Sequence, residues 1–188
     1  DLAKIDRTPG PKSDDYPADC AVDDCLIHGI GRVERQVAGV EISMAARVTV
    51  RDTSIYDCAR AGINISEGTW GGHLIDRCDI FNTVLETDDH GSFNSWGRDR
   101  YWSSNHRGIS EPAVRQDPRL PFLDALEPTV LRYTRWRCDH GWDVDLALGH
   151  LHEADAVLPV VEIQLGPERP AAHADCLVAG RADAHERV

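Results

Sequence analysis

Val50-Arg51-Asp52-Thr53-Ser54-Ile55 is one of four segments that share the same order of side-chain types. Each begins with an aliphatic residue, continues with two polar residues and a Cys or Thr, and reaches Ile or Trp after one more residue. The four segments occupy residues 22–27, 50–55, 75–80 and 131–136. Because they start 28, 25 and 56 residues apart, the pattern indicates an internal repeat with an insertion of about thirty residues in its last interval.

A second short strand is expected after each segment, following a turn. The sequence places these second strands at residues 39–43, 62–66, 84–88 and 141–145. Short strands rich in β-branched residues, at a period of roughly 20–30 residues, predict an all-β chain wound as a parallel β-helix. A leucine-rich repeat is the main rival, but its leucine spacing is absent.

The alignment of the repeats also predicts the interior of this solenoid. Like positions in successive coils stack about 4.8 Å apart and form columns of side chains. Two columns are expected to face inward: Cys25, Thr53, Cys78 and Thr134, and beside them Ile27, Ile55, Ile80 and Trp136.

The domain organisation follows from these segments. Residues 1–19 are rich in Pro, Asp and Lys and are predicted to form a lead-in loop. Residues 20–146 are predicted to form the coils, with residues 89–128 as a long loop insertion. Residues 147–188 form an atypical tail with nine Ala and four His, and without Ser, Thr, Asn, Lys or aromatic residues.

Composition excludes several classes of function. The net charge of −12 argues against a nucleic-acid partner, because a phosphate backbone requires a basic surface. The six cysteines contain no CxxC pair, so buried free thiols are expected instead of a zinc site. The sequence has neither a signal peptide nor an apolar run long enough to span a membrane.

Candidate catalytic residues come from the second strands, where alternate side chains share a face. Under the predicted alignment, one outward column contains Glu41, Asn64, Glu86 and Asp143, and its neighbour contains Ser43, Ser66, Asp88 and Asp145. Four carboxylates would then meet on two adjacent coils, and their repulsion would raise one pKa and create an acid beside a base. Capping of turns and a calcium site are the alternatives.

The predicted insertion begins beside these carboxylates and carries side chains suited to a sugar. Aromatic rings stack on sugar faces, and arginines bind hydroxyls or carboxylates. The candidate substrate-binding residues are His90, Trp96, Arg98, Arg100, Tyr101 and Trp102.

Two longer stretches carry a family resemblance. Residues 86–102, Glu-Thr-Asp-Asp-His-Gly-Ser-Phe-Asn-Ser-Trp-Gly-Arg-Asp-Arg-Tyr-Trp, and residues 138–146, Cys-Asp-His-Gly-Trp-Asp-Val-Asp-Leu, resemble secreted bacterial right-handed parallel β-helix proteins of the pectate-lyase-like superfamily. The resemblance is to a glycoside hydrolase group with α-L-fucosidase and xylanase members. It implies a secreted or periplasmic enzyme that acts on a plant or algal polysaccharide or oligosaccharide without a cofactor.

Two alternatives to hydrolysis stay open. One is a calcium-dependent polysaccharide lyase, and the other is an inactive fragment that at most binds glycans. The tail bears on the second alternative, because the coil pattern of the similar proteins stops after Leu146. We hypothesise that the tail is a frameshifted or artefactual continuation; the alternative is a divergent cap with one strand within residues 157–165.

Overall fold

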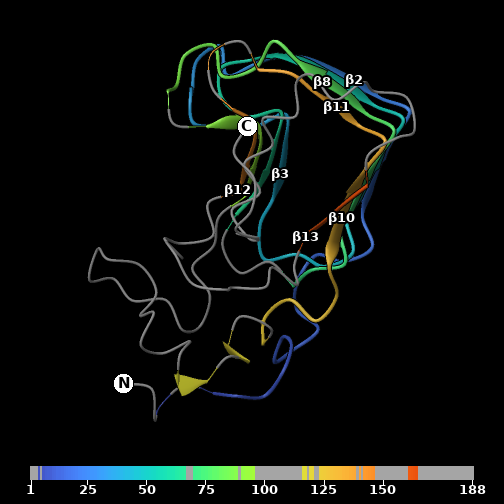
Figure 1. The fold of residues 1–188 in the computed structure, drawn as a ribbon, viewed down its shortest axis with the longest axis vertical. Coiled ribbons are helices and arrows are strands. Elements are labelled where there is room, and N and C mark those ends of the chain that lie inside the picture. Colours follow the sequence, from blue (N-terminus) through green and yellow to red (C-terminus); the bar gives the residue numbers. More distant parts are fainter. Residues whose placement is uncertain are drawn as a thin grey trace, which may run out of the picture.

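The computed structural model describes residues 4, 6–66, 70–88, 90–95, 116–117, 119–120, 123–138, 140, 142–146 and 161–164, the last two ranges by their backbone alone. This part of the chain is nearly all-β, and its thirteen short strands form three sheets in which every pairing is parallel. Viewed nearly along the stack, the three sheets lie on different sides of a common interior (Figure 1). The arrangement is compatible with the predicted parallel β-helix.

Each sheet takes one strand from each successive rung, and a rung is defined here as three consecutive strands. The first sheet has the order β1 (Ala21–Asp23), β4 (Thr49–Arg51), β7 (Leu74–Asp76), β10 (Thr129–Arg132) and β13 (Val161–Gln164). The second contains β2 (Leu26–Ile30), β5 (Ser54–Cys58), β8 (Asp79–Phe81) and β11 (Arg135–Trp136). The third contains β3 (Val40–Ile42), β6 (Ile63–Ile65), β9 (Gly91–Ser95) and β12 (Trp142–Leu146).

The predicted alignment of the four repeat segments is confirmed. In the first sheet Val50 pairs with Val22 on one side and with Ile75 on the other, and Ile75 pairs in turn with Leu131. In the second sheet Ile27, Ile55, Ile80 and Trp136 are in register. These side chains face the interior, where Val50, Ile55, Ile75 and Ile80 are completely buried.

The predicted column of alternating Cys and Thr has a polar role inside the stack. The Thr53 hydroxyl accepts a hydrogen bond from the Cys25 N–H (3.2 Å) and donates one to the Arg51 carbonyl (2.7 Å). Thr134 serves Cys78 in the same way. Each Thr therefore satisfies backbone groups at the corner between the first two strands, where unpaired groups would destabilise the fold.

The five cysteines that the structure describes are free thiols, but the prediction that such thiols are buried is confirmed only in part. Cys58 and Cys78 are buried, as expected, and Cys138 is half-buried. Cys20 and Cys25 are exposed, because they belong to the first rung, which has a neighbour on one side only.

The strand of the third sheet in the third rung differs from the prediction. It is β9 (Gly91–Ser95) and not residues 84–88, which belong to the connection between β8 and β9. Val84 is buried but has a left-handed backbone with φ of 58°, and its N–H donates to the Arg60 carbonyl. Phe93 takes the interior position opposite Ile63. Strand β9 thus lies inside the segment that was predicted as an insertion.

The tail contributes one strand to the stack. Strand β13 lies within the range 157–165 and pairs in parallel with β10, with Ile163 opposite Leu131. The strand lies within the range that the alternative of a divergent cap named, and the origin of the tail stays a hypothesis.

Candidate functional site

A polar column crosses the third sheet on the face opposite the interior. In register, Glu41 of β3 lies opposite Asn64 of β6, Asn64 opposite Asn94 of β9, and Asn94 opposite Asp145 of β12. We call these four positions the amide column. Their neighbours in sequence, such as Ile63 and Phe93, point into the core, as alternation along a strand requires.

Hydrogen bonds connect the described members of the amide column. The Asn94 amide nitrogen donates to Asn64 Oδ1 at 2.6 Å. The Asn64 amide nitrogen donates to both carboxylate oxygens of Glu41 at 2.9 Å, and the Ser66 hydroxyl donates to Glu41 Oε1 at 2.7 Å. All donors therefore point towards the first rung.

The central amides are buried even though they do not face the core. Asn64 is 1% exposed and Asn94 is 2% exposed, whereas Glu41 is exposed. A buried amide is stable only when its polar atoms are hydrogen-bonded, which the column provides at least in part. The column is thus a specified feature of this face and not a run of solvated side chains.

Ser92 is a second buried polar residue of β9, two positions before Asn94. Ser92 is completely buried, and its hydroxyl lies 2.7 Å from the Thr83 hydroxyl. Because Trp142 pairs with Gly91 and Val144 with Phe93, Asp143 lies at the register position of Ser92. Asp143 and Asp145 are two residues apart on β12, at the register positions of Ser92 and Asn94.

The structure separates the four predicted catalytic carboxylates. Glu86 and Asp88 are exposed in the β8–β9 connection, where Glu86 accepts a hydrogen bond from Arg35 at 2.5 Å. Their predicted stacking on Asp143 and Asp145 is wrong, because Ser92 and Asn94 occupy those register positions in the third rung. The prediction assumed that the short connection of the second rung recurs in the third.

His90 directly precedes β9 and is half-buried, with its Nδ1 atom 3.1 Å from the Thr87 hydroxyl. The chain direction brings it to the end of the third sheet where β12 begins, next to the strand that carries Asp143. The other predicted substrate-binding residues, Trp96, Arg98, Arg100, Tyr101 and Trp102, lie outside the described residues, and their assignment stays a prediction.

Sequence reasoning missed Asn94 and Ser92 but had placed Glu41 and Asn64 in one column. A usable signal was present. An Asn comes directly after an interior hydrophobic residue in both Ile63-Asn64-Ile65 and Phe93-Asn94-Ser95. Aligning the two asparagines would therefore have given the observed register.

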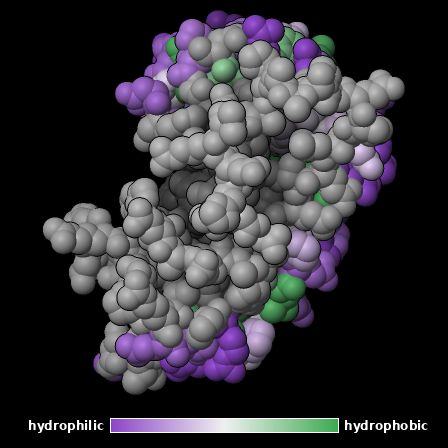
Figure 2. Space-filling view, viewed as in Figure 1, coloured by the Kyte–Doolittle hydropathy of each residue, from purple (hydrophilic) through white to green (hydrophobic). Residues whose placement is uncertain are grey.

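The rest of the described surface gives few indications of another function. Hydrophilic side chains predominate among the described residues on the face shown in Figure 2, with separate small hydrophobic patches. Within the described ranges, no three His, Cys, Asp or Glu side chains are grouped so that they could hold a metal ion. No helix in this part of the chain is long and apolar enough to cross a bilayer.

Comparisons with protein-family models, with curated proteins and with solved structures give no match for this chain.

Proposed function

We propose that the three-sheet stack is a right-handed parallel β-helix and that the chain hydrolyses glycosidic bonds of a plant or algal polysaccharide at the outer face of the third sheet. The observation that supports the proposal best is the amide column, which leads to the carboxylates of β12. The resemblance in residues 86–102 and 138–146 points in the same direction and implies an exported protein.

Asp143 and Asp145 are the proposed catalytic pair. Positions two residues apart on one strand lie about 6.6 Å apart, near the carboxylate separation of inverting glycosidases at roughly 6.5–9.5 Å. In the third rung the same positions hold the neutral residues Ser92 and Asn94. A pair on one strand therefore replaces the pair across rungs that the sequence had suggested.

The direction of the amide column suggests different roles for the two acids. The Asn94 amide nitrogen is used by Asn64, so its carbonyl oxygen is the group that faces the position of Asp145. A carbonyl acceptor favours a proton donor beside it, which a protonated carboxyl supplies. Asp145 is thus the proposed general acid, and Asp143 is the proposed base that activates water.

Neutral amides and hydroxyls beside the acid pair suit a neutral sugar, because hydroxyl groups both donate and accept hydrogen bonds. His90 adds a titratable group at the end of the same sheet. Trp96, Arg98, Arg100, Tyr101 and Trp102 are the proposed sugar-binding residues, since they follow β9 directly in the sequence.

The test is release of reducing sugar from a panel of polysaccharides, with and without EDTA. Asp143→Asn and Asp145→Asn are each expected to lower the rate by at least about 100-fold, the typical contribution of an acid or base group. Glu86→Gln and Asp88→Asn are the matched controls, because both carboxylates lie off the strand and should leave the rate within about threefold.

Other outcomes would change the assignment. Equal losses in the control variants would contradict the register argument. Loss of activity in EDTA together with an unsaturated product would replace hydrolysis by a calcium-dependent lyase reaction. A folded chain that binds glycans without releasing sugar would be a binding protein.

A further inference from the structure

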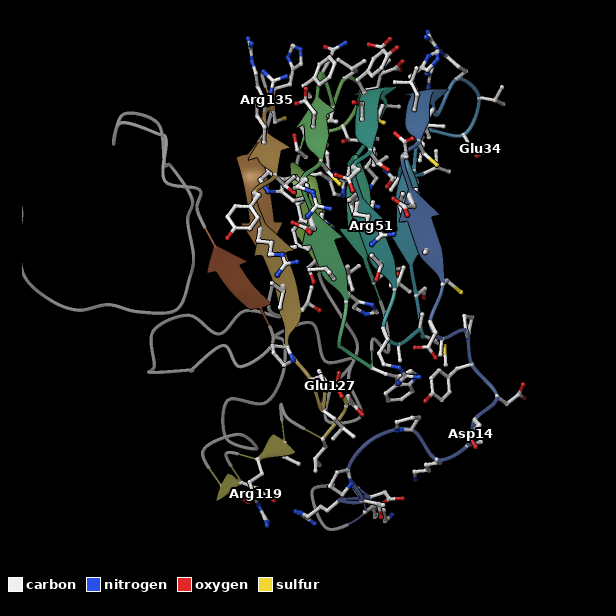
Figure 3. The ribbon with its side chains drawn as sticks, turned by 90° about the vertical axis from the view of Figure 1, so that its right-hand side faces the viewer. Asp14, Glu34, Arg51, Arg119, Glu127 and Arg135 are labelled. Atoms are coloured by element: carbon white, nitrogen blue, oxygen red, sulfur yellow. The ribbon has the colours of Figure 1, made fainter. Side chains whose placement is uncertain are left out.

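Among the described residues, the first rung has a neighbouring rung on one side only. Strands β1, β2 and β3 are the outermost strands of their sheets, and no described residue pairs with their outer edges. Figure 3 shows these strands at one side of the stack, beyond the rung that carries Arg51. An unpaired edge exposes backbone donors and acceptors and readily pairs with another strand.

The hydrogen-bond pattern identifies the free backbone groups. Thr49 N–H bonds to the Cys20 carbonyl and Ser54 N–H to the Cys25 carbonyl. In a parallel ladder with this register, the N–H and C=O groups of Ala21 and Leu26 point away from the second rung. Both residues therefore offer an unused donor and acceptor at the free edge.

Apolar side chains at this end are only partly covered. Val22, Ile27, Ile30 and Val40 are half-buried against the core, whereas their partners in the second rung are completely buried: Val50, Ile55, Cys58 and Ile63. Three of the six large hydrophobic residues that are exposed in the described chain lie in or next to the first rung: Leu26 in β2, Val33 in the β2–β3 connection and Met44 just after β3.

A column of rings on the second sheet ends open at the same place. His28 stacks on Tyr56 and Tyr56 on Phe81, with centroids 5.0 Å apart in both pairs. At the other end Arg135 lies over Phe81, 5.6 Å from its centroid. The outer face of the exposed His28 ring has no such partner among the described residues.

The lead-in does not cover this end. Its N-terminal part contacts the segment before β10, through a hydrogen bond from Gly10 N–H to the Leu123 carbonyl and a salt bridge of Arg7 with Asp117. The lead-in therefore lies below the strands, and Figure 3 shows Asp14 there, on the same side of the stack as the first rung.

Charge indicates which kind of partner fits. Asp19 and Asp23 of the first rung are paired with Arg47 and Arg51 of the second, at 2.7 and 2.5 Å. A basic partner would have to compete with these arginines. A second copy brings carboxylates that are already neutralised, together with the same free edges and apolar side chains.

We propose that two copies of this chain associate through their first rungs, by two-fold antiparallel pairing of the free edges. Such an interface is isologous, so each unused donor at Ala21 or Leu26 meets an acceptor of the partner copy. The interface would also bury the half-exposed aliphatic side chains and the outer face of His28.

The experiment measures the mass of the full chain by sedimentation over a wide range of concentrations. A dimer is expected, and Leu26→Lys should weaken it by about tenfold or more, because an edge lysine opposes strand pairing. Leu126→Lys is the matched control: Leu126 is 57% exposed, against 63% for Leu26, but lies outside the first rung, so its dimer should be unchanged.

A second variant tests backbone pairing. Ala21→Pro removes an edge N–H without breaking a bond to β4, and should also weaken the dimer in a chain shown to be folded by circular dichroism. Hydrogen exchange of the β1 and β2 amides identifies the occupant of the edge. Protection that appears with dimerisation and is lost in Leu26→Lys supports the proposal. Protection that is independent of concentration would show that another segment of the same chain pairs with the edge. A folded monomer with rapid exchange would show that nothing pairs with the edge. Both outcomes overturn the proposal.

Discussion

His73 is a buried histidine whose chemistry is structural. It is 1% exposed, and its Nδ1 atom accepts a hydrogen bond from the Val48 N–H at 3.1 Å. Burial lowers its pKa to about 4 from the ordinary 6.5, because the charged imidazolium is poorly solvated there. An acceptor at Nδ1 also requires that this nitrogen carries no proton.

This shift predicts a dependence of stability on pH. Above pH 6.5 His73 is neutral in both the folded and the unfolded chain, and its contribution to stability is complete. As the pH falls from 6.5 to about 4, the unfolded chain takes up the proton and the folded chain does not, so up to about 3 kcal/mol is lost. Urea unfolding at pH 7.5 and pH 4.5 measures the loss.

His73→Asn is the control, because the Asn side-chain oxygen can accept from Val48 N–H and does not titrate. It should remove this share of the pH dependence whatever its effect at neutral pH. An unchanged difference between the two pH values would show that other groups, such as the ion-paired aspartates, cause the acid sensitivity.

At the scale of elements, charges alternate across the strands of the first sheet. In register, Asp23, Arg51, Asp76 and Arg132 follow one another from β1 to β10. Asp76 has a side-chain exposure of only 3% and lies between arginines, with salt bridges to Arg77 and to Arg132, the latter at 3.0 Å. The outer ion pairs lie between side chains that are roughly half exposed.

The two kinds of pair should differ in their contribution to stability. Asp76→Asn leaves two arginines without their buried partner and is expected to cost about 2 kcal/mol of unfolding free energy, below the fully buried range because both arginines are partly solvated. Asp23→Asn, at the exposed end of the same ladder, should cost less than about 1 kcal/mol. Equal effects in urea unfolding would contradict this ranking.

The elements also show how far the sequence could be interpreted. The first two strands of each rung are separated by a corner of constant length, with one left-handed residue in every rung: Asp24, Asp52, Arg77 and Tyr133. A constant corner preserves the period, so the register of the first two sheets could be predicted. The connections into the third sheet span residues 31–39, 59–62, 82–90 and 137–141, and no period survives such variation.

The candidate site inherits this limit. Its position on the third sheet and the carboxylates of β12 were predicted, whereas Glu86 and Asp88 were assigned to the wrong element. The amide column depends on which residues of two strands lie opposite one another, and the unequal connections hide this register unless Asn64 and Asn94 are aligned.

At the scale of the whole molecule, stability comes from columns that run through all rungs, so each end of the stack matters. Repeat structures of this kind gain stability from each interface between neighbouring units. At one end, the first rung has no further rung beside it among the described residues. At the other end β13 continues the first sheet, with Ile163 opposite Leu131 in the column that contains Val50 and Ile75.

The tail can therefore be tested as a structural part of the fold. Ile163→Asn should lower the unfolding free energy by about 1–2 kcal/mol, less than a fully buried aliphatic residue because Ile163 lies at the end of the column. Glu162→Gln alters the adjacent position, which pairs with Val130 on the opposite face, and should be nearly neutral. Urea unfolding measures the unfolding free energy of both variants and of a chain that ends at Leu146.

If the tail is a foreign continuation without a structural role, all three chains should match the wild type. A loss in Ile163→Asn that equals the loss on truncation would instead show that β13 is the part of the tail that stabilises the stack.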